Sequence, residues 1–262
     1  MIALLIPILV GWALGFLVNY LADVLPTTRR LSRPACPECG DSYPLLDYLL
    51  GRSCRRCGRR RPVRIWIVFL LMAILSTYIW IHPPARSGFA IGIIILTYFA
   101  TVFVIDMEHR LILHITSIVG SILGLAAGWL SHGLLPTLLG GLGGFLIMLV
   151  LYFLGVLFSR FRARRLQALG QRADEEESLG AGDVILAGIL GLALGWPLIW
   201  FGLLLGILLG GVYAILLVFY MFFMKKYKER ALMVFMPYGP FFILSAFFIL
   251  FLPHWILTMV PK

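Results

Sequence analysis

Long apolar runs separated by short polar breaks dominate the pattern of this chain. Each run approaches the roughly 20 residues that a helix needs to cross the hydrocarbon core of a bilayer. The runs are Ile2–Ala22, Ile65–Ile81, Phe89–Ile105, Ile115–Leu130, Leu134–Phe158, Val184–Trp200, Phe201–Met224 and Phe241–Met259. The sixth and seventh are continuous, and as one helix they would be about twice as long as the hydrocarbon core is thick. We therefore predict that the chain turns back at Gly195-Trp196-Pro197.

The composition agrees with this pattern and excludes a soluble domain. Of 262 residues, 61% are hydrophobic and only 13% are charged, whereas soluble domains are about 25% charged. We predict an all-α polytopic membrane protein with about eight transmembrane helices. A hydrophilic stretch at residues 23–64 is large enough to be a module of its own. It would lie between a first transmembrane helix (1–22) and a multi-helix membrane domain (65–262).

The basic residues give the orientation of the predicted spans. Of the 22 Lys and Arg residues, only Arg86 and Lys262 fall outside the odd-numbered loops. Because loops rich in Lys and Arg stay in the cytoplasm, we expect these loops to be cytoplasmic and both termini to lie outside. Orientation and attraction to anionic lipid headgroups then explain the net charge of +10. A nucleic-acid partner is not expected.

All four cysteines lie in the hydrophilic stretch, in two CxxC pairs. Cys36 and Cys39 form the first pair, Cys54 and Cys57 form the second, and 14 residues separate the two pairs. This spacing is typical of a zinc ribbon in which four thiolates surround one ion and leave no position open for catalysis. Two disulfides or free thiols are the alternatives, and a reducing cytoplasm argues against disulfides. The pattern favours a structural zinc site in a small cytoplasmic insertion.

Two aspartates fall at the same predicted edge of the membrane. Asp106 ends the third span going inward, and Asp183 opens the sixth span going outward. Two carboxylates brought close together share a proton, because both cannot ionise cheaply. In that state one can accept a proton from water while the other donates to the oxyanion, which is aspartic protease chemistry. Two simpler roles remain open: Asp183 as a helix N-cap, and pairing of Asp106 and Glu108 with Arg110.

With these residues in place, the sequence resembles the prepilin peptidases, also called type IV leader peptidases, which are GxGD membrane aspartic proteases. Five elements carry the resemblance: Gly180-Ala-Gly-Asp183, Asp106-Met-Glu108-His109, Gly15 to Pro26, Pro44 to Tyr48 between the CxxC pairs, and Met236 to Phe241. The chain departs from the family pattern in three places. Ile185 stands where Lys is frequent, Leu113-His114 replaces Pro-Asp or Pro-Asn, and Val24 replaces Arg.

The resemblance implies a function. Such an enzyme cleaves leader peptides from type IV prepilin or type II pseudopilin precursors after a glycine, at the cytoplasmic membrane edge, with Asp106 and Asp183 as the catalytic pair. Many relatives also methylate the new amino terminus with S-adenosylmethionine. A noncatalytic assembly scaffold and an ion-coupled transporter are the alternatives. The acidic run at residues 174–177 could recruit basic leaders, or it could be a solvated loop.

Overall fold

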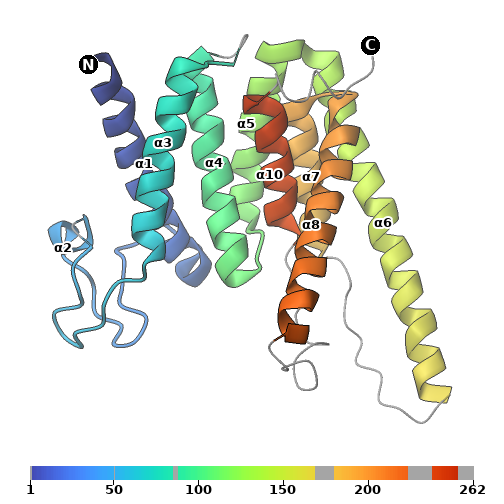
Figure 1. Ribbon diagram of the computed structural model, residues 1–262, viewed down its shortest axis with the longest axis horizontal. Helices are drawn as coiled ribbons and strands as arrows, with labels where there is room; N and C mark the ends of the chain where they lie inside the picture. The colour runs from blue at the N-terminus through green and yellow to red at the C-terminus, as the bar shows by residue number, and fades with distance from the viewer. Residues whose placement is uncertain (1, 50, 85–87, 169–179, 224–237, 253–262) are drawn as a thin grey trace. The chain divides into compact units, whose positions relative to one another are not determined.

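The computed structural model describes residues 2–49, 51–84, 88–168, 180–223 and 238–252, and most of these residues are helical. Figure 1 shows the helices in chain order: α1 (Ile2–Thr28), α2 (Leu45–Leu49), α3 (Arg64–Ile81), α4 (Gly88–His109), α5 (His114–His132), α6 (Leu134–Ala168), α7 (Ala181–Leu194), α8 (Leu198–Phe223) and α10 (Gly239–Phe251). Within these ranges the only β-type pairing is an isolated bridge between Ala35 and Ser42. The predicted all-α class is confirmed.

Among the described residues, six helices are long and apolar enough to cross a membrane: α1, α3, α4, α5, α6 and α8. The protein is therefore a multi-pass membrane protein. α7 and α10 are also apolar but have 14 and 13 residues, which at about 1.5 Å per residue gives roughly 20 Å. The last predicted span, Phe241–Met259, continues past residue 252 and so lies partly outside the described residues.

The predicted turn between the sixth and seventh apolar runs is confirmed. α7 ends at Leu194 and α8 begins at Leu198. Gly195 follows α7 with a φ of 75°, a conformation that glycine adopts without the steric cost that other residues would have. The Gly195 N–H donates to the carbonyl of Gly191, which closes the end of the helix.

The chain forms two compact units, Met1–Ile115 and Thr116–Lys262. In the first unit, α3 packs against α1 along a row of small residues, and α4 packs against both. A Cβ added to Gly11 would lie only 2.4 Å from the carbonyl oxygen of Met72, so the two backbones are in direct contact. The Ser76 hydroxyl also donates to the Pro7 carbonyl at 2.8 Å. α1 and α3 therefore form a tight pair, visible in Figure 1.

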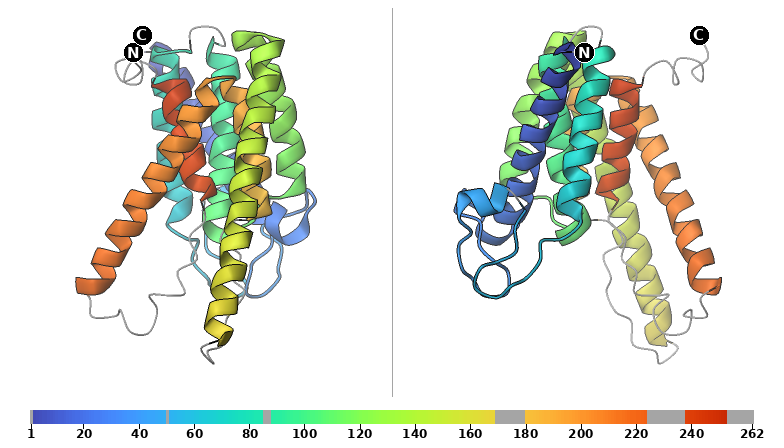
Figure 2. Two further views of the ribbon diagram at one scale, coloured as in Figure 1. Left: turned by 90° about the vertical axis from the view of Figure 1, so that its right-hand side faces the viewer. Right: turned by 60° about the vertical axis from the view of Figure 1, so that its left-hand side comes forward.

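In the second unit, α7 is held by α6, α10 and α8. The α6 and α7 backbones touch at glycines: a Cβ on Gly191 would lie 2.1 Å from the Gly140 carbonyl oxygen, and one on Gly144 would lie 2.4 Å from that of Ala187. Small residues allow this approach in membrane helices. Both views in Figure 2 show α10 beside α8, where Gly206 faces the Phe242 ring. These contacts fix the short helix that begins just before Asp183.

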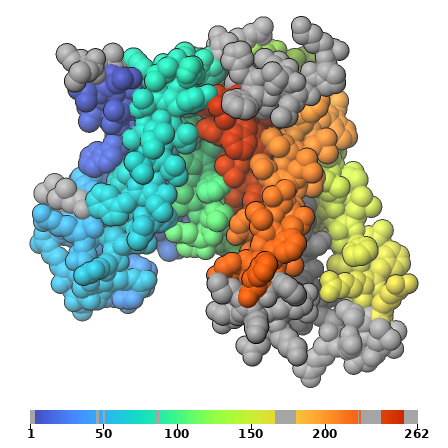
Figure 3. Space-filling view, in the orientation of Figure 1, coloured from blue at the N-terminus to red at the C-terminus, as the bar shows by residue number. Residues whose placement is uncertain are grey.

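Apolar side chains cover the outer surface of the helices. On α3, seen at the surface of its unit in Figure 3, Trp66, Ile67, Leu70 and Leu71 are all exposed. α8 carries a similar exposed row, including Leu204, Leu208 and Val212. So much exposed apolar surface would be unfavourable in water, but it is expected for helices surrounded by lipid.

Candidate functional site

The two CxxC pairs form knuckles with the same hydrogen-bond pattern. In the first, the Cys36 N–H donates to Asp41 and the Gly40 N–H donates to Cys36. In the second, the Cys54 N–H donates to Arg59 and the Gly58 N–H donates to Cys54. Gly40 and Gly58 have φ of 70° and 71°, which lets each loop turn back sharply. Local sequence alone therefore builds two matching thiol pairs.

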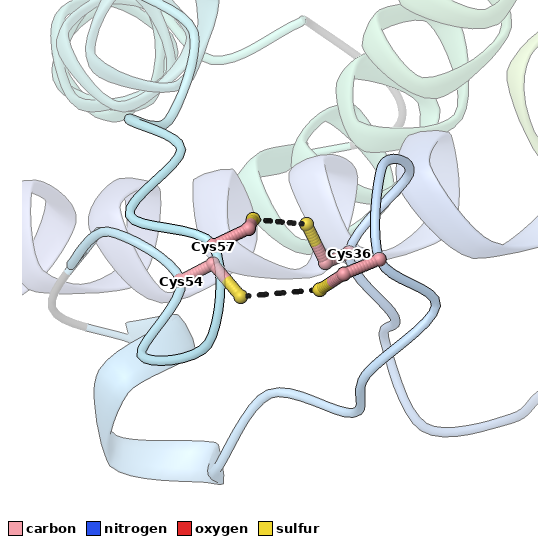
Figure 4. Close-up of side chains that lie close together, drawn as sticks. Cys36, Cys54 and Cys57 are labelled. Carbon is pink, nitrogen blue, oxygen red and sulfur yellow. Dashed lines mark hydrogen bonds between the residues drawn. The ribbon is translucent and has the colours of Figure 1, made fainter.

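The knuckles face each other and bring all four sulfur atoms together. Cys36 Sγ lies 3.5 Å from Cys57 Sγ, and Cys39 Sγ lies 3.6 Å from Cys54 Sγ (Figure 4). All four sulfurs lie within 4.8 Å of one another, and all four cysteines are free. Tetrahedral zinc with Zn–S bonds of about 2.3 Å requires sulfurs roughly 3.8 Å apart. The predicted group of metal-ligating cysteines is confirmed as a cluster that could hold a metal.

Backbone amides favour the thiolate form of one cysteine in each knuckle. Hydrogen bonds from the backbones of Cys39 and Glu38 lower the pKa of Cys36 to about 6. Those from Cys57 and Arg56 likewise lower the pKa of Cys54. Thiolates are the form that binds zinc, so these amides favour metal binding at Cys36 and Cys54, whereas the pKa values of Cys39 and Cys57 are raised. The fit of the four cysteines to zinc therefore rests on the positions of their sulfur atoms.

The cysteine module is packed onto α1. Cys36, Tyr43, Tyr48 and Cys54 form a small buried core that also contacts Phe16 and Tyr20 of α1. The Tyr48 hydroxyl donates to Asp23 Oδ2 at 2.5 Å. Burial, and then the charge of Asp23, raise the pKa of Tyr48, so its hydroxyl stays protonated and acts as the donor. The segment from Pro44 to Tyr48 carries part of the family resemblance, but nothing in its sequence predicts this contact with α1.

Asp106 lies in the last turn of α4 and is only 4% exposed. Its Oδ2 atom is buried and has no hydrogen-bond partner. Such an oxygen in an apolar environment is costly. Glu108, two residues later, forms an ion pair with Arg64, whereas the sequence suggested Arg110 as its partner.

Asp183 lies in the first turn of α7 and is 9% exposed. The N-cap position is occupied by Gly180, with φ −77° and ψ 140°, and the Asp183 N–H donates to the Gly180 carbonyl. Asp183 is therefore the third residue inside the helix, where the positive end of the helix dipole favours a carboxylate.

The two aspartates belong to different compact units, so their pairing stays a prediction. The acidic run at residues 174–177 lies outside the described residues, as do Met236 and Pro237. The remaining residues of the motif that runs from Met236 to Phe241 lie at the start of α10, with Tyr238 at the N-cap and Pro240 in the first turn.

A cleft of about 570 Å³ opens within the first unit. Its lining joins the end of α1, the cysteine module and the end of α4, and includes Asp23, Tyr43, Arg61, Arg64 and Glu108. These residues come from distant parts of the chain, and the sequence reasoning did not bring them together.

Comparison with known proteins supports the family resemblance. Residues 93–215 match the type IV leader peptidase family, and this segment contains both Asp106 and Asp183. The chain is also 26% identical over 223 residues to the prepilin leader peptidase/N-methyltransferase of Myxococcus xanthus (strain DK1622). That similarity covers 79% of this chain and 61% of the relative, so the chain spans about three fifths of the relative's length. No solved structure matches the chain.

The resemblance drawn from the motifs is thereby confirmed: this chain is similar to the type IV leader peptidases, the prepilin peptidases.

Proposed function

We propose that this protein is a membrane aspartic endopeptidase that removes leader peptides from type IV prepilin or type II pseudopilin precursors. The observation that carries the proposal is the position of the two aspartates. Asp106 and Asp183 both lie within the family match, both are buried, and each lies in the terminal turn of an apolar helix. Helical membrane proteins retain buried carboxylates mainly where they have a function.

In the proposed mechanism, Asp106 and Asp183 act together on a peptide bond and one water molecule. The ionised carboxylate takes a proton from water as the water oxygen attacks the carbonyl carbon. The protonated carboxyl donates a hydrogen bond to the developing oxyanion, and the proton taken from water later reaches the leaving amine. The carbon–nitrogen bond of the peptide then breaks, and the products are a free carboxylate and a free amine.

We assign the cysteine cluster a structural zinc ion, held by Cys36, Cys39, Cys54 and Cys57. The sulfur separations support this assignment. A site of four thiolates leaves no coordination position for substrate, so the ion would stabilise the module at residues 23–64 and take no part in hydrolysis. The proposed division keeps residues 1–22 as the first transmembrane helix and 65–262 as the peptidase domain.

The proposed location is the bacterial inner membrane, with the module and the catalytic edge on the cytoplasmic side and both termini outside. The distribution of basic residues supports this orientation. Methylation of the new amino terminus with S-adenosylmethionine is part of the proposal because the Myxococcus xanthus relative is named an N-methyltransferase. Precursor proteins and membrane lipids are the proposed partners.

Mass spectrometry of a prepilin co-expressed with this protein in a strain without its own prepilin peptidase tests the proposal. We expect the mass to fall by that of the leader, with a further gain of one methyl group if the second activity is present. A precursor recovered at full length with every candidate prepilin and pseudopilin would contradict the peptidase proposal and favour a noncatalytic scaffold.

A further inference from the structure

Three helices of the first unit meet at one guanidinium group. Asp23 lies near the end of α1, Arg64 is the first residue of α3, and Glu108 lies in the last turn of α4. Arg64 uses its two terminal nitrogens separately: Nη2 donates to Asp23 and Nη1 donates to Glu108. The planar fork of arginine suits this double contact, which the single ammonium of lysine cannot reproduce with the same geometry.

This contact reaches the turn that carries Asp106. Glu108 follows Asp106 by two residues, and the Arg110 N–H donates to the Asp106 carbonyl at 2.9 Å. Arg110 has a φ of 54°, so the helix ends there. The Asp106 carboxyl group and the ion pair of Glu108 therefore share one short terminal turn, and a displacement of that turn moves both.

Helix stability alone does not explain the charges in this cluster. Arg64 stands at the amino end of α3 and Glu108 at the carboxyl end of α4, which are the ends where the helix dipole disfavours each charge. Arg64 is also largely buried, with its side chain 16% exposed. Together the three residues connect the ends of three helices through one arginine side chain.

A second arginine extends the contact to the cysteine module. Arg61 donates to Asp23 at 3.2 Å, and its guanidinium carbon lies 4.0 Å from the centre of the Tyr48 ring. Asp23 thus pairs both with Arg61 of the module and with Arg64, which in turn pairs with Glu108 on α4. The seating of the module and the position of the α4 end depend on the same carboxylate.

We propose that Arg64 is a positioning residue, which holds the last turn of α4 and with it the carboxyl group of Asp106 in the geometry needed for peptide cleavage. This inference rests on the proposed function, since it assumes that Asp106 acts on the peptide bond. Arg64 itself takes no part in the chemistry.

The test combines kinetics with a structural measurement. Full-length protein in detergent or lipid is prepared as wild type, Arg64→Gln, Glu108→Gln, the double variant, and Arg59→Gln as a matched control. The control removes the same charge and breaks an exposed ion pair with Glu38 inside the module. Cleavage of a prepilin precursor gives kcat and KM separately, and hydrogen exchange reports the amides at residues 106–110.

We expect Arg64→Gln and Glu108→Gln each to lower kcat about 10- to 100-fold with KM nearly unchanged. The double variant should be no worse than Arg64→Gln, since both changes break the same ion pair between Arg64 and Glu108. Amide exchange at the α4 end should rise about tenfold in both variants, while Arg59→Gln changes neither kcat nor exchange.

Three results would overturn the inference. Unchanged kcat and amide exchange in Arg64→Gln would show that Arg64 does not hold the last turn of α4. A rise in KM alone would indicate that Arg64 contacts substrate in the cleft. An equal loss in Arg59→Gln would reduce the effect to surface charge. If the wild-type protein cleaves no precursor, the proposed function fails, and the exchange measurement still decides whether Arg64 holds the α4 end.

Discussion

The guanidinium group of Arg61 lies over the ring of Tyr48, with its central carbon 4.0 Å from the ring centre. The same group is 5.1 Å from the centre of the Tyr43 ring, and its side chain is only 8% exposed. The aromatic rings and the Asp23 carboxylate offset part of the cost of removing this cation from water, while its buried Nε has no hydrogen-bond partner. This stack fastens the cysteine module to the end of α1, so the module is part of the first unit and not a domain on a free linker.

The proposed catalytic pair is tested by replacing each aspartate with its neutral isostere. We expect Asp106→Asn and Asp183→Asn each to reduce cleavage to background, because a carboxamide can neither share the proton nor accept one from water. Cleavage of a prepilin precursor by purified protein measures this. Asp41→Asn, at an exposed position in the module, is the matched control and should cleave normally. Near-normal turnover in either active-site variant would remove that residue from the mechanism.

Metal removal should loosen the module and leave the membrane helices folded. We expect about one zinc ion per chain in wild-type protein, and loss of the ion on replacing Cys36 or Cys57 with Ser. Trypsin should then cut within residues 29–61, where many arginines are exposed. Metal analysis and mass spectrometry of the digest report both effects. Ser53→Ala, next to Cys54, should retain the ion, and a protease-resistant module without metal would contradict a structural role.

The seating of the module on α1 is tested at Tyr48. Its hydroxyl donates to Asp23 at 2.5 Å and lies 3.3 Å from the Asn19 carbonyl, so Tyr48→Phe should destabilise the seated module by about 1–2 kcal/mol. The expected result is faster tryptic cleavage in the module while the zinc content is unchanged. Tyr220→Phe, at an exposed position of α8, should behave as wild type. Equal protection in both variants would show that the hydroxyl contributes nothing to the seating.

The close contact between α6 and α7 predicts that adding a single methyl group to a glycine at this contact lowers the stability of the protein. Gly191→Ala would place a Cβ 2.1 Å from the Gly140 carbonyl oxygen, so the two helices must separate, at a cost of about 1–3 kcal/mol. We expect a lower thermal unfolding temperature in detergent. Gly211→Ala is the matched control, because nothing lies within 4 Å of its added Cβ. That change should be neutral or slightly stabilising in a helix, and equal melting of the two variants would contradict the packing argument.

Several features of this protein follow from local chemistry and can be predicted from its sequence. Apolar runs of sufficient length predict membrane helices because lipid cannot satisfy the polar groups of an open backbone. The turn at Gly195 follows from the excess length of one run and from the properties of glycine and proline. The knuckles at Cys36 and Cys54 follow in the same way, since each closes through hydrogen bonds within a few residues.

Tertiary structure alone decided which polar groups meet. Arg64 and Glu108 are 44 positions apart, and Arg61 and Asp23 are 38 apart. Local periodicity does not say which helix ends become neighbours, and Arg110 was as reasonable a partner for Glu108 from the sequence. The choice is made by the packing of α1, α3 and α4, where glycines such as Gly11 let backbones touch and so place Arg64 between two carboxylates. The physical reason is that an ion pair depends on a distance in space, which only the packed helices set.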